Sequence, residues 1–142
     1  MMLRLSREVE TAIREAGAAA WPNECCGILF GREADGRRAV EAAKPIVNAR
    51  EDGEQYHRFL ITAEDMLQAE LEARRSGREI LGFYHSHPDH PAKPSDYDRE
   101  HALPGYTYLI LQVEQGRPAA LTGWQLRPDR EAFVSEPFTV EP

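Results

Sequence analysis

The spacing of hydrophobic residues predicts a first helix near the N-terminus. Ser6 can accept a backbone hydrogen bond as the N-cap, and Pro22 can end the helix after about Ala20 because proline has no N–H to donate. The apolar residues in between recur at helical intervals, so they would form one buried stripe. They are Val9, Ile13, Ala16 and Ala20.

A second helix is predicted from Thr62 to about Arg75. Thr62 and Asp65 have the spacing of a capping box, in which each side chain bonds the backbone of the other, and Gly77 can adopt the left-handed conformation that ends a helix. Its larger apolar residues are expected on one buried side. They are Met66, Leu67 and Leu71.

Short apolar or alternating stretches predict the strands of a sheet. Asp35–Gly36 is typical of a two-residue hairpin turn, and Pro45 is expected to interrupt the strand that follows. The polar segment 48–55 is expected to be a mobile loop that faces a partner. A short helix is expected to begin near Ser95. The predicted strands are 25–31, 38–48, 56–61, 79–87, 106–113, 118–126 and 131–140.

Length and composition indicate one globular domain, 1–142, because 142 residues can bury roughly 68–70% of the unfolded surface. The 17 basic and 24 acidic residues give a net charge of −7 without a basic stripe, which argues against nucleic acid as a partner. No segment has the length of a membrane span or a signal peptide, so we expect a cytoplasmic protein. Cys25 and Cys26 are neighbours that point to opposite faces of a strand, so we expect buried thiols and no disulfide.

His85 and His87 are the first candidates for chemistry. Residues two apart in a strand lie on one face, so both imidazoles could bind the same metal ion. They follow an apolar run that ends at Phe83, as expected where a buried strand reaches a cleft. An isolated His-x-His pair is also common as surface or core histidines.

Asp98 could supply a third ligand if the helix that begins at Ser95 faces the same cleft. Ser95 and Asp98 also have the spacing of an ordinary helix cap. Glu24 lies far upstream, just before a predicted strand, and a carboxylate beside a metal-activated water could accept and return a proton. A single glutamate at a strand edge is otherwise solvated.

Together these residues resemble the JAMM motif of the MPN+ metalloproteases. In that family an early glutamate is followed by His-x-His, then by seven residues and Ser-x-x-Asp, and here the seven residues are 88–94. The resemblance covers most of the chain. It implies an α/β fold, a single MPN (JAMM) domain with a curved mixed β-sheet flanked by helices, similar to cytidine deaminases.

The resemblance also implies a site and a reaction. His85, His87 and Asp98 would bind Zn2+, Glu24 would act as general base and then acid, and Ser95 would hydrogen-bond the tetrahedral oxyanion. The chain would be a zinc metallopeptidase that hydrolyses an amide or isopeptide bond by attack of a zinc-bound water. The bond would follow the C-terminal Gly-Gly of a ubiquitin-like sulfur-carrier protein or its peptide adduct, for example with release of cysteine.

Other functions are compatible with the same residues. A zinc hydrolase of small peptides or other amides would need the same ligands, because selectivity is set by the pocket walls. A non-catalytic MPN scaffold is disfavoured because all five motif residues are present. A nucleotide deaminase lacks its Pro-Cys-x-x-Cys ligands here. The sequence determines neither the oligomeric state nor the strand edge that would bind a substrate tail.

Overall fold

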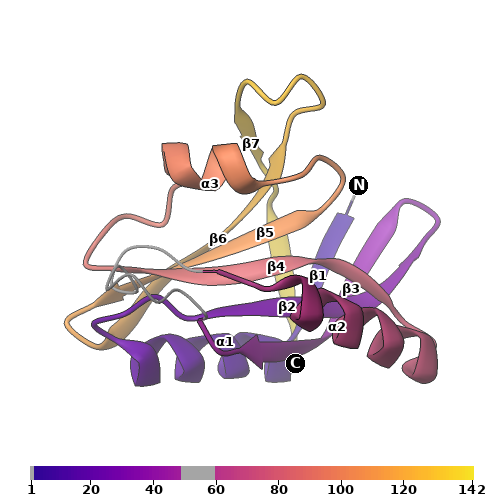
Figure 1. The fold of residues 1–142 in the computed structure, drawn as a ribbon, viewed down its shortest axis with the longest axis horizontal. Helices are drawn as coiled ribbons and strands as arrows, with labels where there is room; N and C mark the ends of the chain where they lie inside the picture. The colour runs from indigo at the N-terminus through magenta and orange to yellow at the C-terminus, as the bar shows by residue number, and fades with distance from the viewer. Residues whose placement is uncertain (1, 49–59) are drawn as a thin grey trace.

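The computed structural model describes residues 2–48 and 60–142. These residues form eight strands and three helices, and Figure 1 shows the strands across the middle of the molecule, with α1 along one side and α3 on the other. In chain order the elements are β1 (Met2–Ser6), α1 (Arg7–Ala20), β2 (Cys26–Ala34), β3 (Arg37–Ile46), α2 (Ala63–Ser76), β4 (Glu79–Pro88), α3 (Asp96–His101), β5 (Thr107–Glu114), β6 (Arg117–Leu126), β7 (Phe133–Ser135) and β8 (Phe138–Glu141).

All the strands of the described residues belong to one mixed sheet, in the order β7-β6-β5-β4-β2-β3-β1-β8. β4 pairs parallel with β5, and β1 pairs parallel with β3 and β8, whereas the other neighbours are antiparallel. β7 and β8 lie at opposite ends of this order, although only Glu136 and Pro137 separate them in sequence. The sheet therefore curls: a Cβ on Gly123 of β6 would lie 2.5 Å from the Glu136 carbonyl oxygen. The predicted curved mixed sheet is confirmed.

The two faces of the sheet carry separate cores because successive residues of a strand point to opposite sides. On one face, Val9 and Ile13 of α1 pack in a cluster that includes Leu29 and Tyr84. On the other face, α2 covers a cluster that includes Ile28. The α1 face is the larger core and gives β4 a fixed support from which the opposite face can present functional groups.

Several local predictions are confirmed. The Ser6 side chain caps α1 by accepting from the Val9 N–H, and α2 has the full capping box of Thr62 and Asp65. Asp35 and Gly36 both have positive φ, 52° and 74°, as a two-residue hairpin between β2 and β3 requires. Hydrogen bonds within one helix turn therefore determine where α1 and α2 begin, and the positive φ of two adjacent residues determines the hairpin turn.

The predicted apolar side of α2 is confirmed at Met66 and wrong at Leu67 and Leu71. Leu67 and Leu71 are 54% and 41% exposed, whereas Ala69 and Ala73 are buried against the sheet, with Met66 packed beside them. Small alanine side chains allow the helix to lie close to β2 and β4, and the leucines then point outward. The sequence of α2 contains a stripe of alanines and a stripe of leucines, and the alanines are the ones that face the core.

The strand predictions need three corrections. β1 was not predicted, Pro45 lies within β3 rather than interrupting it, and the predicted strand 131–140 is two strands, β7 and β8. Pro45 is tolerated because β1 pairs with β3 only as far as Val40, so the other edge of β3 needs no N–H there among the described residues. Most of the predicted loop 48–55 and strand 56–61 lies outside the described residues; Leu60 and Ile61 belong to no strand.

None of the helices in residues 2–48 and 60–142 combines the length and apolar character needed to cross a membrane. The two cysteines are free and buried, as predicted, and burial raises the pKa of Cys25 to about 11 and that of Cys26 to about 12. These thiols are therefore protonated core residues and poor nucleophiles at neutral pH.

Candidate metal centre

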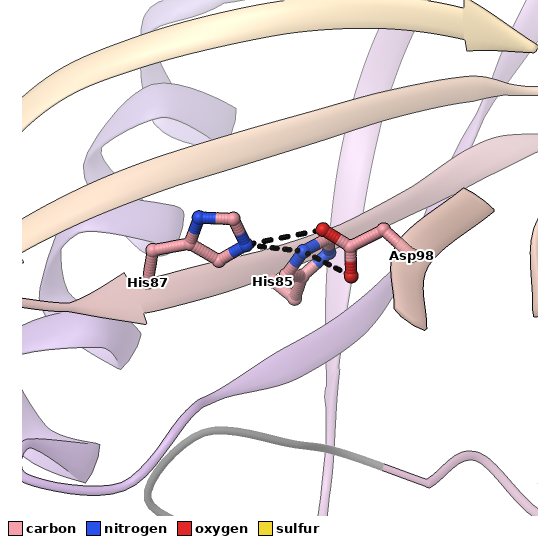
Figure 2. Close-up of side chains that lie close together, drawn as sticks. All are labelled: His85, His87 and Asp98. Atoms are coloured by element: carbon pink, nitrogen blue, oxygen red, sulfur yellow. Dashed lines mark hydrogen bonds and ion pairs between the residues drawn. The ribbon is translucent and has the colours of Figure 1, made fainter. Parts of the chain in front are cut away.

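His85 and His87 project from the same face of β4, the face opposite α1. Both rings are largely buried, with 2% and 7% exposure. Their Nε2 atoms lie 3.2 Å apart (Figure 2). β4 lies between β2 and β5 in the sheet, so backbone hydrogen bonds on both sides hold the two histidines in this arrangement. The structure thus places two imidazole nitrogens at one point.

Asp98 reaches the same point from the first turn of α3. Its Oδ1 lies 3.2 Å from the His85 Nε2 and its Oδ2 lies 3.2 Å from the His87 Nε2, as Figure 2 shows. Ser95 is the N-cap: its Oγ accepts from the Asp98 N–H at 3.1 Å, and its N–H donates to the Asp98 Oδ2 at 2.9 Å. The pattern Ser-x-x-Asp is therefore a capping box, and that box also directs the carboxylate at the histidines.

The charges of this cluster are strongly coupled. Burial alone would raise the pKa of Asp98, but His85 and the hydrogen bonds from both histidines and the Ser95 N–H hold that pKa far below its usual range. Burial would lower the pKa of His85, but the Asp98 carboxylate outweighs it and raises that pKa. The carboxylate thus stabilises positive charge among the three side chains, whether carried by a proton or by a cation.

The donor set fits a divalent cation of the zinc type. His85, His87 and Asp98 each offer one ligand atom, and these atoms lie within 4.8 Å of one another. Tetrahedral ligands at about 2.0–2.1 Å from zinc are roughly 3.3 Å apart. The two Nε2 atoms, 3.2 Å apart, match that spacing, and each lies 3.2 Å from one of the two Asp98 oxygens. Three protein ligands leave a fourth position for water or substrate, so these residues could hold a catalytic metal.

The loop after β4 orients His87. The Nδ1 atom of His87 lies 2.8 Å from the carbonyl oxygen of Pro91, which can only accept a hydrogen bond, so Nδ1 carries the proton. With Nδ1 as the donor, a neutral His87 ring has its Nε2 free to bind a metal ion at the point it shares with His85 and Asp98, which is the tautomer a metal ligand needs. Sequence reasoning missed this contact because a backbone carbonyl has no signature in the residue pattern.

Glu24 is held beside the cluster by Ser86, the residue between the two histidines. Ser86 is fully buried, and its Oγ accepts from the Cys25 N–H at 2.8 Å, while its own N–H donates to the Cys25 carbonyl at 3.2 Å. These bonds fix the backbone next to Glu24 relative to β4. Sequence reasoning assigned Ser86 no role, because both contacts join segments that are remote in sequence.

Glu24 is itself buried, with 6% of the residue exposed. Burial raises its pKa to about 8; His85 opposes this shift and Asp98 adds to it. Without a nearby cation the group is therefore mostly protonated at neutral pH, and it could change protonation state within the physiological range.

Glu24 and His87 line a pocket of about 470 Å3 between the end of β4 and the start of α3. Ser95 also lines it, so all the expected catalytic groups meet one cavity. His90 is exposed and also lines this pocket. The remaining lining residues are Pro91, Lys93, Asp96 and Tyr97.

Two comparisons establish the class of protein to which this fold and site belong. Residues 6–127 match the family described as prokaryotic homologs of the JAB domain. Desampylase of Haloferax volcanii is 39% identical to the chain over 108 residues, which are 75% of this chain and 74% of the relative.

Solved structures agree with this assignment. A solution structure of a protein from Desulfitobacterium hafniense has 29% identity and a TM-score of 0.85, covering 99% of this chain and 93% of the other. A solution structure from Salinibacter ruber has 40% identity and a TM-score of 0.76, covering 97% and 91%. A JAB1/MPN domain protein of Archaeoglobus fulgidus, 17% identical, shares the fold with a TM-score of 0.61, covering 99% and 97%.

The class is thus the JAB/MPN fold with a cluster of two histidines and an aspartate that could bind a metal. The chain belongs to the prokaryotic JAB family and is a hydrolase of the JAMM type. The resemblance drawn from the motif is confirmed.

Proposed function

We propose that this chain is a single-domain, zinc-dependent metallopeptidase of ubiquitin-like proteins. It hydrolyses the amide or isopeptide bond after the C-terminal Gly-Gly of a sulfur-carrier type protein, for example with release of cysteine. The observation that carries the proposal is the convergence of His85, His87 and Asp98 at the edge of a pocket that His87 lines together with the buried Glu24. The 39% identity to Desampylase supports a protein substrate.

His85, His87 and Asp98 would hold the zinc ion. Bound there, zinc would lower the pKa of a coordinated water to about 7, and as a Lewis acid it would polarise the scissile carbonyl. The protein contributes the orientation of these ligands: the Pro91 carbonyl selects the His87 tautomer, and the cap at Ser95 directs Asp98.

Glu24 is the proposed proton carrier. Burial raises the pKa of Glu24 to about 8, and a cation bound by His85, His87 and Asp98 would lower that value. The carboxyl group would therefore titrate close to neutral pH. It would accept a proton from the attacking water and return it to the leaving amine. The water oxygen joins the glycine carbonyl carbon, the C–N bond breaks, and the products are a glycine carboxylate and an amine.

Ser95 is the proposed oxyanion donor. Its Oγ already accepts a hydrogen bond from the Asp98 N–H at 3.1 Å, and this bond fixes the oxygen while leaving the hydroxyl hydrogen to donate. A donor held in place before the reaction stabilises developing negative charge at little reorganisation cost. Ser95 lines the pocket with Glu24, so the two groups can act on one carbonyl.

Mass spectrometry of a carrier protein ending in Gly-Gly-Cys, incubated with the zinc-loaded protein, tests this function. We expect a loss of mass equal to one cysteine residue, abolished by a chelator and by Glu24→Gln. An intact carrier, together with intact isopeptide-linked conjugates, would contradict the proposal. Equally fast cleavage of a short free Gly-Gly-Cys peptide would favour a hydrolase of small peptides.

A further inference from the structure

Lys93 is the pocket residue to which neither the motif nor the proposed reaction gives a task. Of the eight residues that line the pocket, it alone has a permanent positive charge, while Glu24 and Asp96 are acidic. Its side chain is exposed, and it forms no salt bridge in the described part of the chain. The protein thus keeps an uncommitted cation at the mouth of a site in a molecule with a net charge of −7.

The backbone that carries Lys93 is tightly fixed. Its N–H donates to the Pro91 carbonyl at 2.8 Å, and the preceding Ala92 is 5% exposed, with its carbonyl accepting from the Thr122 hydroxyl at 2.6 Å. Pro94 follows and restricts the backbone further. The side chain of Lys93 therefore extends into the pocket lining from a fixed backbone, whose Pro91 carbonyl also contacts His87.

We propose that Lys93 binds the carboxylate of the leaving group and so selects substrates in which a free amino acid is joined through its α-amine to the carrier tail. This inference rests on the proposed function. The Gly-Gly tail on the carrier side of the scissile bond is uncharged, so it offers no partner for the Lys93 ammonium group. The leaving amino acid carries its carboxylate only two bonds from the scissile nitrogen, within reach of a lysine side chain.

An isopeptide-linked lysine differs at this point. Its scissile nitrogen is separated from the main chain by four methylene groups, and within a protein its carboxyl group is an uncharged amide. Lys93 would then gain no ion pair with the leaving group. The geometry thus favours release of a single amino acid over removal of a protein conjugate.

The test compares two carriers that differ by one group: one ends in Gly-Gly-Cys with a free carboxylate, the other in the same sequence with a C-terminal amide. We expect the wild type to prefer the acid by roughly tenfold in kcat/KM, and Lys93→Gln to reduce this preference to about one. Lys44→Gln is the matched control, because Lys44 is the other lysine of the chain and pairs with Glu72 away from the pocket. It should keep the preference.

Binding provides a readout independent of turnover. In a Glu24→Gln background, calorimetry should show tighter binding of the acid than of the amide, and added Lys93→Gln should remove that difference. Equal cleavage of acid and amide by the wild type would overturn the inference while leaving the proposed function intact. If Lys93→Gln lowered kcat/KM equally for the acid and the amide, Lys93 would instead contact the carrier protein, and the inference would be wrong. Cleavage of neither substrate would contradict the proposed function itself.

Discussion

Glu24 is a buried carboxyl group whose protonation should control the stability of the metal-free protein. The unfolded chain titrates it near 4.5, and burial raises its pKa in the fold to about 8. Between these values the folded state holds a proton that the unfolded state has lost, so ionisation favours unfolding. The stabilising contribution is complete below the unfolded pKa and is lost as pH rises through the folded pKa.

The size of the effect follows from the two values. A shift from 4.5 to about 8 corresponds to an upper limit of about 5 kcal/mol, of which about 4 kcal/mol should be lost between roughly pH 5 and pH 9. Glu24→Gln removes the titrating group and keeps its volume. The raised pKa of His85 acts in the same direction in both proteins; because Glu24 contributes to that shift, their difference measures Glu24 together with its interaction with His85.

Urea unfolding of the chelator-treated wild type and Glu24→Gln across this pH range measures the effect. The free energy of unfolding of the wild type should fall relative to the variant by about 3–4 kcal/mol as pH rises. Parallel pH profiles for the two proteins would refute a raised pKa, and with it the description of Glu24 as a proton carrier poised near neutral pH.

Three further substitutions test how the site is held. Ser86→Ala leaves the Cys25 N–H buried without its acceptor, so a urea titration should show a loss of about 1–3 kcal/mol in the free energy of unfolding. At saturating zinc the substitution should lower kcat more than it raises KM. Gly82→Ala places a Cβ 1.8 Å from the Thr107 carbonyl oxygen, so calorimetry should show a loss of at least about 2 kcal/mol; an unchanged melting temperature would contradict this packing. Ser95→Ala should lose about 1 kcal/mol of stability with the cap and at least about tenfold in kcat, whereas Ser95→Thr should keep the stability.

The parts of the fold that were predictable are those determined by local chemistry. Ser6 and Thr62 each bond a backbone N–H within their own helix turn, and the turn at Asp35–Gly36 needs only two residues with positive φ. The same holds for Ser95 and Asp98, whose mutual hydrogen bonds both begin α3 and aim the carboxylate. These interactions depend on residues a few positions apart, so their spacing is visible in the sequence.

The missed features depend on contacts between distant segments. β1 carries a visible alternation at Leu3 and Leu5, but it is short, and both of its partners, β3 and β8, are remote in sequence. The strand predicted over 131–140 divides because the curled sheet takes the chain from one edge to the other at Glu136 and Pro137. Periodicity carries no information on such closure.

The site shows the same division. The motif brought His85, His87, Asp98, Glu24 and Ser95 into consideration. The structure clusters the first three and places Glu24, His87 and Ser95 on one cavity. The groups that orient them, the Ser86 hydroxyl and the Pro91 carbonyl, became recognisable only from the pairing of β2 with β4 and from the path of the loop after β4.

Metal content measured on three purified proteins tests the central claim most directly. The wild type, Glu24→Gln and Asp98→Ala would be dialysed against equimolar zinc and analysed by native mass spectrometry, with hydrolysis of the Gly-Gly-Cys carrier followed in parallel. We expect about one zinc in the wild type, the same zinc in Glu24→Gln with a rate at least about 100-fold lower, and zinc lost from Asp98→Ala. Zinc bound equally to Asp98→Ala, or full activity in Glu24→Gln, would contradict the assignment of these residues.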